Sequence, residues 1–335
     1  MNILVIKLGA IGDVIRTTAI LPGLKDKYPD SKIDWITKKE SFDILKNNDL
    51  INDTYLMDES PKDKLKGKQY DLLINLDDDN EACKLAAEIK HRDIIGAHIE
   101  NEKQVYTENS SLWFDMGLIS KFGKEKADQL KARNKTTYQG IMYGILGLDY
   151  KSQEPILILN DEELKFGKDF AEKNSINEDD LVIGINTGAG GRWKDKKLSE
   201  ELTAELIDKL NAIKNVKLLL LGGLEEKERN EIIKGSVTTS IIDAGCDNSL
   251  MKFASLVNLC DILITSDSLA MHIGTALKKK IIAFFYPTSA SEIELYDKGV
   301  KIIGKGNSYC SYQKDCDSPP KWDTDEIVDG VKSLV

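Results

Sequence analysis

The most constraining feature of this chain is an apolar run that ends abruptly in small hydroxyl residues and an aspartate. The run Ile262-Leu263-Ile264 leads into Thr265-Ser266-Asp267-Ser268, and a helical pattern of apolar residues continues to Leu277. This order predicts a strand, a tight polar turn and the start of a helix. Free backbone N–H groups in the first helical turn, together with the hydroxyl groups of Ser266 and Ser268, suit a phosphate group. Ser and Asp are also ordinary helix caps, so the turn alone leaves both interpretations open.

A second turn of the same kind lies at the other end of the chain. Residues 2–8 form a mainly apolar run, typical of a parallel strand covered on both faces. Gly9 and Gly12 permit a tight turn and close approach of a ligand. Asp13 is then expected to open a helix over residues 13–28, where the helix dipole favours its charged form. A plain capping role for Asp13 remains the alternative.

Two common nucleotide signatures are missing. The chain has no Gly-x-Gly-x-x-Gly, and the second expected strand, 32–37, does not end in an acidic residue, which argues against NAD binding in this half. It also has no Gly-Lys-Ser/Thr after a glycine loop, so it is not a P-loop nucleotide hydrolase.

Composition and charge narrow the class of protein. The net charge of −10 argues against a nucleic-acid-binding protein. No window approaches the roughly 18–20 continuous apolar residues of a membrane span, and Met1 leads directly into a core strand. We therefore expect a cytoplasmic protein, with peripheral contact at the inner membrane face left open. The run of lysines around Gly67 is a solvated loop or an anion-binding patch; it comprises Lys62, Lys64, Lys66 and Lys68.

The order of expected elements predicts two domains. Strands and helices alternate through the first 95 residues, and residues 107–148 carry helical patterns such as 110–121 and 135–146. The polar stretch 149–155 is the candidate linker, and a second alternation follows. We predict an α/β protein with two Rossmann-like parallel-sheet domains facing a cleft, residues 1–150 and 155–322. The amphipathic stretch 324–335 predicts a helix that packs back on the N-terminal domain.

Further strand-end turns carry candidate ligand groups. A glycine loop after the expected strand 181–186 contains Thr187 and Gly188, and four cations follow it: Arg192, Lys194, Lys196 and Lys197. Glycines and cations together suit a diphosphate, although a flexible surface loop is the alternative. Glu225 and Glu226, after Gly222-Gly223, could hold a ribose diol or simply begin a helix. His272 lies one turn into the helix after Ser268. Its two possible roles are a contact to phosphate and an ordinary packed side chain.

Together these motifs resemble the glycosyltransferase family of bacterial lipopolysaccharide heptosyltransferases. The matching residues keep their order over nearly the whole chain: Lys7 with Gly12-Asp13-Val14, the Gly188–Lys197 loop, Ser266-Asp267-Ser268 with His272, and Pro287-Thr288. The resemblance implies a GT-B fold, ADP-heptose as the sugar donor and inverting transfer to a saccharide or lipid-linked glycan. It implies no metal and no cofactor beyond the donor.

The resemblance also assigns roles to individual residues. Asp13 resembles the general base that deprotonates the acceptor hydroxyl, and Lys196 resembles the lysine that binds the donor diphosphate. The remaining donor contacts that it implies are Thr187, Gly188, Glu225 or Glu226, Asn248 near adenine, and Asp267, Ser268 and His272 at the phosphates. The candidate acceptor contacts are Lys7, Gly12, Lys62 and Lys64.

Two departures from the family pattern matter. Leu269 stands where many members have glycine, so backbone donation at that point can differ. Ser311 and Trp322 stand where relatives have further cysteines beside Cys310 and Cys316, which argues against a structural metal. Asp77-Asp78-Asp79 is the nearest approach to a metal-binding acidic motif, and an acidic helix start is the favoured interpretation.

The chemistry agrees with the resemblance. Charge that develops on a leaving diphosphate needs cations and helix N-termini, and an acceptor hydroxyl needs a base. The alternatives are a GT-B transferase or epimerase using another nucleotide sugar, a transferase that glycosylates a protein, and a non-catalytic nucleotide-binding protein.

Overall fold

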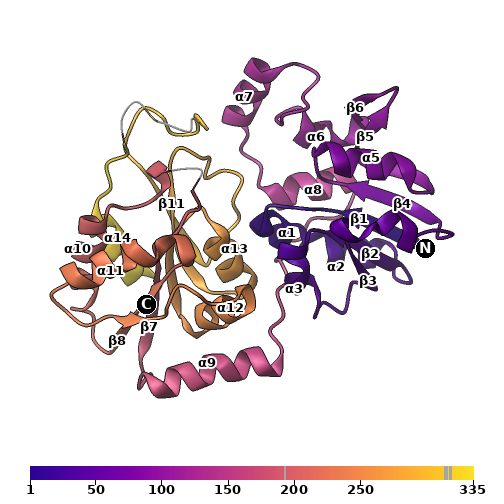
Figure 1. Ribbon diagram of the computed structural model, residues 1–335. Coiled ribbons are helices and arrows are strands. Elements are labelled where there is room, and N and C mark those ends of the chain that lie inside the picture. The colour runs from indigo at the N-terminus through magenta and orange to yellow at the C-terminus, as the bar shows by residue number, and fades with distance from the viewer. Residues whose placement is uncertain (192–193, 313–315, 317–318) are drawn as a thin grey trace. The chain divides into compact units, whose positions relative to one another are not determined.

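The chain forms two compact units (Figure 1). The computed structural model describes residues 1–191, 194–312, 316 and 319–335. The first unit comprises Met1–Ile158 with Ser291–Glu294, and the second comprises Leu159–Ala290 with Leu295–Val335. Within these described residues, no helix is long and apolar enough to cross a membrane.

The first unit is built on a six-stranded sheet with the order β3-β2-β1-β4-β5-β6. Neighbouring strands pair in parallel from β3 to β5, and β6 pairs antiparallel with β5. Its elements are β1 (Asn2–Ile6), α1 (Ile11–Thr17), α2 (Ile20–Lys27), β2 (Lys32–Thr37), α3 (Phe42–Leu45), β3 (Asp53–Leu56), α4 (Pro61–Lys64), β4 (Tyr70–Asn75), α5 (Asn80–Glu88), β5 (His91–Glu100), β6 (Lys103–Tyr106), α6 (Ser111–Phe114), α7 (Lys124–Arg133) and α8 (Tyr138–Leu146).

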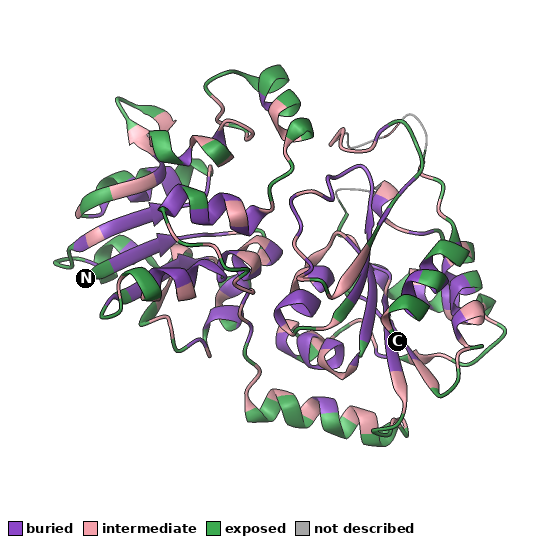
Figure 2. Ribbon diagram, turned by 180° about the vertical axis from the view of Figure 1, so that it is seen from behind, coloured by how far each residue is buried: buried purple, intermediate pink, exposed green. Residues whose placement is uncertain are grey.

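Burial explains the unbroken apolar strands of this sheet. Helices lie on both of its sides, and its central strands are buried in Figure 2. Leu4 and Ile6 of β1 pack with Leu73 of β4 and with Leu85 of α5 in one core. Strands covered in this way have no solvent-facing side, so their sequences do not alternate between apolar and polar residues.

The second unit contains a six-stranded sheet with the order β12-β11-β10-β7-β8-β9, in which all the neighbouring pairs are parallel. Its elements are α9 (Asp161–Lys173), β7 (Leu181–Asn186), α10 (Glu200–Leu210), β8 (Val216–Leu221), α11 (Lys227–Ser236), β9 (Ile242–Asp243), α12 (Leu250–Leu259), β10 (Ile262–Ser266), α13 (Leu269–Ala276), β11 (Lys280–Phe285), β12 (Gly299–Ile303) and α14 (Thr324–Leu334).

The C-terminal helix corrects one expectation from the sequence. Residues 324–335 were expected to pack on the N-terminal domain, but α14 belongs to the second unit. Its apolar face, with Ile327 and Val331 fully buried, packs into the core formed by α10 and by strand residues such as Ile282 and Phe284. The amphipathic pattern predicts that the helix buries one face, but it carries no information on which domain receives that face.

Several element boundaries also differ from the sequence predictions. The helix expected over 13–28 is two helices, and α1 starts at Ile11 with Ala10 as its N-cap. Of the helix expected over 110–121, only the short α6 forms. Helix α9 was not predicted, although Asn160 and Glu163 form a capping box at its start, which is a local signal in the sequence.

Candidate functional site

Both sheets have a topological switch point, where consecutive connections leave a strand pair in opposite directions. In the second unit this point lies between β7 and β10, which are neighbours in the sheet. In the first unit it lies between β1 and β4. Ligands of open α/β sheets bind outside the carboxyl ends of the strands at such points. The turns highlighted by the sequence therefore stand where each sheet can accept a ligand.

Side-chain hydrogen bonds hold the two turns of the second unit together. Asn186, the last residue of β7, donates from Nδ2 to the Gly188 carbonyl at 2.9 Å and to Thr265 Oγ1 at 3.1 Å. Ser266 Oγ donates to the same Gly188 carbonyl at 3.3 Å. Ser268 Oγ lies 3.0 Å from Thr265 Oγ1. The start of the glycine loop is thus fixed against the turn that leads into α13.

A buried ion pair lies at the centre of this turn. Lys196 Nζ contacts Asp267 Oδ2 at 2.8 Å and the Asp267 carbonyl at 2.9 Å, and Thr288 Oγ1 donates to the same carboxylate at 2.8 Å. Burial opposes ionisation of Asp267, but the charges of Lys196 and His272 and these hydrogen bonds hold its pKa below the ordinary value. The structure therefore brings Lys196 next to Asp267 and His272, which lie about seventy residues further along the chain.

This arrangement retains hydrogen-bond donors for an anion. An ammonium group has three N–H donors, and Asp267 accepts two of those of Lys196. Ser268 is the N-cap of α13 and its side chain makes no capping bond. The first turn of a helix leaves backbone N–H groups without partners in the helix and carries partial positive charge. A phosphate at this turn would meet a lysine held in place and a helix N-terminus.

The glycine loop packs closely against Glu226. A Cβ atom at Gly188 would lie 2.8 Å from Glu226 Oε2, so only glycine fits there without displacing that carboxylate. Glu226 is buried and accepts hydrogen bonds from Lys197 Nζ at 2.9 Å and from the Gly223 N–H at 3.1 Å. Glu225, next to it, is exposed. Arg192, one of the four predicted cations, lies outside the described residues.

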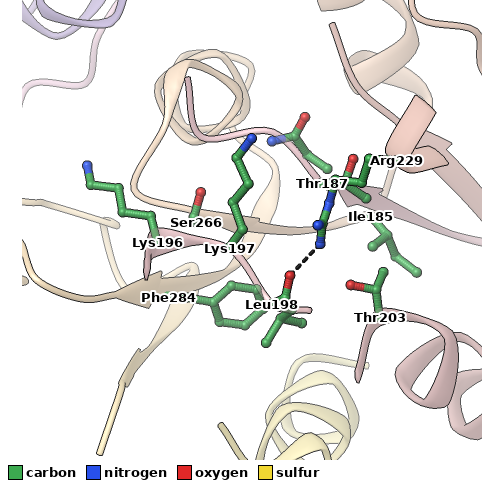
Figure 3. A pocket seen from close by; sticks show the side chains of 10 residues that line it. Ile185, Thr187, Lys196, Lys197, Leu198, Thr203, Arg229, Ser266 and Phe284 are labelled. Carbon is green, nitrogen blue, oxygen red and sulfur yellow. Dashed lines mark hydrogen bonds between the residues drawn. The ribbon is translucent and has the colours of Figure 1, made fainter. Parts of the chain in front are cut away.

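A small cavity lies beneath this loop (Figure 3). Its volume of about 10 Å³ has room for roughly one water molecule. The guanidinium group of Arg229 binds the Leu198 carbonyl and Glu200, while its Nε has no hydrogen-bond partner among the residues described. The cavity is lined by Ile185, Asn186, Thr187, Lys196, Lys197, Leu198, Thr203, Arg229, Ser266 and Phe284. Its size indicates a packing feature that supports the loop.

Two other residues that were predicted to contact the sugar donor make local hydrogen bonds within the second unit. Thr187 Oγ1 donates to Asn230 Oδ1 at 2.6 Å, which ties the end of β7 to α11. Asn248 Nδ2 donates to the Ala244 carbonyl at 2.9 Å and to the Gly245 carbonyl at 3.3 Å, in the connection from β9 to α12. Both lie after carboxyl ends of strands, on the same edge of the sheet as Asp267.

In the first unit, Asp13 lies in the first turn of α1. Its carboxylate pairs with Arg16 at 2.8 Å and its side chain is about one-third exposed. The guanidinium of Arg16 stacks over the ring of Tyr138, 3.8 Å from the centroid, and lies 5.7 Å from the Trp113 ring. Tyr138 is buried and its hydroxyl lies 2.6 Å from Thr17 Oγ1. The carboxylate of Asp13 is therefore oriented by a cation that two aromatic rings hold in place.

Lys7 and Asp77 form a second buried ion pair beside this turn. Their charged groups lie 2.9 Å apart, and Lys7 Nζ also donates to the Leu76 carbonyl at 3.3 Å. The other carboxylate oxygen of Asp77 accepts a hydrogen bond from the Leu8 N–H. Burial opposes the charge, but the carboxylate of Asp77 outweighs it and raises the pKa of Lys7. Lys7 therefore joins the ends of β1 and β4, and the carboxylate of Asp77 neutralises its positive charge.

A cavity opens at the carboxyl ends of β1, β2 and β4. Its volume is about 490 Å³, within the usual range for small-molecule sites. It is lined by Leu8, Gly9, Ala10, Ile11, Lys38, Glu40, Ser41, Asp77, Asp78 and Asp79. Asp79 also caps α5, since its side chain accepts from the Glu81 and Ala82 N–H groups, as an acidic helix start predicts.

Lys62 and Lys64 do not join this cavity. Lys62 pairs at 2.9 Å with Glu88, the last residue of α5, and Lys64 pairs with Glu59. The chain from Glu88 runs directly into β5, so Lys62 lies toward the amino ends of the strands. The structure thus separates these two lysines from Lys7 and Gly12, and it favours the solvated surface interpretation of the lysine run.

A search of the described ranges for metal sites finds no group of three or more His, Cys, Asp or Glu residues placed to hold a metal ion. Cys310 and Cys316 are both free cysteines.

Comparison with known protein families identifies the chain's relatives. Residues 60–321 match the model of glycosyltransferase family 9 (heptosyltransferase). The chain belongs to this family. It is 24% identical over 317 residues to lipopolysaccharide heptosyltransferase 1 of Campylobacter coli, covering 91% of this chain and 90% of that protein. It is accordingly a glycosyltransferase.

Solved structures agree on the fold. A glycosyltransferase family 9 protein of Veillonella parvula superposes with a TM-score of 0.82 at 18% identity, covering 99% of this chain and 96% of that one. The E. coli ADP-heptose lipopolysaccharide heptosyltransferase II superposes with a TM-score of 0.67 at 19% identity, covering 100% and 98% of the two chains. The two-sheet α/β architecture of this family member is therefore the GT-B fold, as the motifs predict.

The structure adds residues to the candidate site that the motifs do not indicate. Arg16 carries a readable signal, because a residue three positions after Asp13 shares its helix face. Tyr138 lies more than a hundred residues away and carries none. Asn186 is the last residue of β7, where a systematic search of polar residues at strand ends would have found it. Thr288 belongs to the Pro287-Thr288 motif, and the structure adds its hydrogen bond to Asp267.

Proposed function

We propose that this glycosyltransferase moves a heptose residue from ADP-heptose to a hydroxyl group of a saccharide acceptor of the lipopolysaccharide-core type. Membership of the heptosyltransferase family supports the reaction class. The E. coli relative, an ADP-heptose lipopolysaccharide heptosyltransferase, supports the donor. The single observation that carries the proposal is the turn after β10, where Lys196, Asp267 and the N-terminus of α13 meet.

In the second unit, this turn would bind the donor diphosphate. The third N–H donor of Lys196 and the first-turn N–H groups of α13 would contact phosphate oxygens. When the bond between the sugar C1 and the diphosphate breaks, negative charge increases on the leaving ADP. Donors that are already oriented stabilise that charge without reorganising. Cationic side chains and a helix dipole can supply this stabilisation, so we propose transfer without a metal ion.

In the first unit, Asp13 would act as the general base. Its carboxylate would accept the proton of the acceptor hydroxyl as that oxygen bonds to the sugar C1. The C1–O bond to the diphosphate breaks in the same displacement, so the configuration at C1 inverts. Arg16 and the Tyr138 ring would hold the carboxylate in one orientation, as a base within hydrogen-bond reach requires.

A donor panel tests this function. ADP, UDP and GDP are titrated by calorimetry, and each matching sugar nucleotide is then assayed for nucleotide release with a lipopolysaccharide-core oligosaccharide. We expect ADP alone to bind strongly and ADP-heptose alone to turn over. Binding of UDP or GDP without ADP would refute the donor assignment. Undiminished turnover after exhaustive chelation is expected, and its loss, restored by a divalent cation, would refute metal independence.

A further inference from the structure

Exposed apolar side chains gather in and after α6 of the first unit. Among the described residues ten large apolar side chains are exposed, and three of them fall within residues 112–122. These are Leu112, Leu118 and Phe122, with 56%, 89% and 52% of their surfaces exposed, and Leu118 is the most exposed of the ten. Single apolar residues scattered over a surface are ordinary, whereas apolar residues that gather in one place indicate an interaction surface.

Hydrogen bonds hold this connection between α6 and α7 in a fixed form. The Tyr106 hydroxyl donates to Asp115 Oδ1 at 2.6 Å and accepts from the Lys121 N–H at 3.0 Å. Leu118 lies between these two anchored residues, and Phe122 directly follows the second. The exposure of both apolar side chains is therefore imposed by an ordered backbone.

The same stretch has a charge opposite to that of the whole chain. Residues 118–135, here called the basic segment, carry six cations and two carboxylates, a net charge of +4 in a chain of net charge −10. Helix α7 within it is exposed along most of its length (Figure 2). Lys126, Arg133 and Lys135 are exposed and form no ion pair with any described residue. The cations of the segment are Lys121, Lys124, Lys126, Lys131, Arg133 and Lys135.

Apolar side chains beside a cluster of cations fit the surface of a bilayer that contains anionic lipids. Clusters of about four to eight Lys or Arg residues are typical of segments that bind such lipids. Lysine can lay its methylene chain along apolar material while its ammonium group reaches the phosphates. Interfaces between proteins favour Arg and are poor in Lys, whereas five of the six cations here are Lys. The composition therefore favours a lipid surface over an acidic protein.

We propose that the basic segment docks this protein on an anionic bilayer, with Leu118 and Phe122 inserted among the headgroups and the cations held against lipid phosphates. The apolar and electrostatic contributions to such docking add together. The segment follows α6, whose Trp113 ring lies 5.7 Å from the guanidinium of Arg16, the ion-pair partner of Asp13. Docking would thus place the bilayer on the unit that carries the proposed base. The inference goes beyond the proposed function and requires neither its donor nor its acceptor.

Co-sedimentation of the full chain with vesicles tests the inference. The probes are vesicles of phosphatidylcholine alone and vesicles of equal parts phosphatidylcholine and phosphatidylglycerol. We expect binding to the anionic vesicles to be at least about tenfold tighter, and this advantage to disappear in high salt, which screens exposed charges. Equal binding to the two kinds of vesicle, or binding to neither, would overturn the proposal.

Charge reversal assigns the binding to the segment. The triple variant Lys126→Glu, Arg133→Glu and Lys135→Glu should weaken binding to anionic vesicles by at least about a hundredfold, because each cation near the bilayer contributes roughly fivefold. A control variant reverses three exposed lysines of the second unit and changes the net charge equally. It should weaken binding by less than about tenfold, since distant exposed charges are screened. An equal loss in both variants would overturn the assignment. The control lysines, which form no ion pair with a described residue, are Lys168, Lys173 and Lys214.

Removal of the apolar side chains tests their insertion. Leu118→Ser combined with Phe122→Ser should weaken binding to anionic vesicles by at least about tenfold, because burial of Leu and Phe in the bilayer is favourable. Ile232→Ser is the control, since Ile232 of α11 is 50% exposed and should leave binding unchanged. Unaltered binding of the double variant, at an unchanged melting temperature, would refute the insertion.

A second copy of the chain is the competing occupant of this surface. Sedimentation velocity without vesicles distinguishes it from lipid. We expect the same sedimentation coefficient for the unmodified protein and for the variant with Leu118→Ser and Phe122→Ser. A dimer that this variant converts to a monomer would overturn the proposal, because the apolar side chains would then be covered by protein.

The outcome separates from that of the proposed function. Vesicle binding is measured without nucleotide or saccharide, so a wrong donor leaves this result intact. Conversely, normal turnover of ADP-heptose with a lipid-free oligosaccharide, together with no binding to anionic vesicles, would preserve the proposed function and refute the docking surface.

Discussion

Replacing Asp13 by Asn is the sharpest test of the catalytic assignment. Asparagine keeps the shape of the side chain but cannot accept a proton at neutral pH. A positioned general base contributes about 10²–10⁴ in rate, which corresponds to about 3–5 kcal/mol of activation free energy. We therefore expect turnover of ADP-heptose to fall by that factor, while ADP affinity stays within about twofold, since Asp13 lies in the first unit and the proposed phosphate turn in the second.

The effect of Asp13→Asn on stability is expected to be small. The variant loses a partly exposed ion pair with Arg16, worth about 0–1 kcal/mol. It also loses a negative charge in the first turn of α1, worth about 0.3–1 kcal/mol. For a unit of this size, a loss of about 1 kcal/mol lowers Tm by roughly 2–4 °C. Unfolding therefore cannot account for a hundredfold loss of turnover at 25 °C.

Arg16→Gln is the matched control. It breaks the same ion pair but leaves the carboxylate, so it should reduce turnover by less than about tenfold through poorer orientation of Asp13. The assay is ADP release coupled to a spectrophotometric readout, with melting temperature and ADP calorimetry for each variant. Turnover of Asp13→Asn close to that of the unmodified protein would refute the base assignment. So would an equal fall in both variants, since the ion pair alone would then explain the loss.

Three further predictions concern the second unit. Lys196→Ala should weaken ADP binding by about 1–3 kcal/mol and His272→Ala by less, and an unchanged ADP dissociation constant in Lys196→Ala would exclude the lysine as a phosphate contact. The pKa of Asp267 is lower in the folded state than in the unfolded state, so the ionised carboxylate stabilises the folded state. This stabilisation is complete above the ordinary aspartate pKa of about 4 and disappears as the pH falls through the lower folded-state pKa. Asp267→Asn should accordingly lower Tm near neutral pH by leaving Lys196 buried without its partner, with a difference that shrinks in acid; a Tm difference independent of pH would contradict this linkage. Ile327→Ala should lower the free energy of unfolding of the second unit by about 2–5 kcal/mol in denaturant unfolding. Lys332→Ala, on the exposed side of α14, should change it by less than about 0.5 kcal/mol. Equal effects of the two variants would contradict the packing of α14.

Features that depend on short stretches of chain could be read from the sequence. The apolar runs that form β1, β7 and β10 reflect burial on both faces, and the polar turns after them mark the carboxyl edge of each sheet. Asp13 and Asp267 were found because each follows such a strand within a few residues. The two-domain α/β class follows from the same alternation of elements, whereas the GT-B fold was implied by the resemblance to the heptosyltransferase family.

Features that depend on distant contacts required the tertiary structure. The partner of Lys7 is Asp77, and the ring that supports Arg16 belongs to Tyr138. Neither pairing leaves a local pattern, because strand order decides which strand ends meet. The separation of Lys62 from Lys7 and Gly12 arises in the same way, from the path of α4 between two strands.

The C-terminal helix shows the division most clearly. Its sequence determined that one face, with Ile327 and Val331, would be buried. Apolar residues at helical spacing lie on one face of the helix, and removing that face from water is favourable. The domain that buries this face depends on the exposed apolar surface left beside β11 by α10, which no local pattern encodes. Periodicity is a property of one segment, whereas a packing partner is a property of two surfaces that only the folded chain brings together.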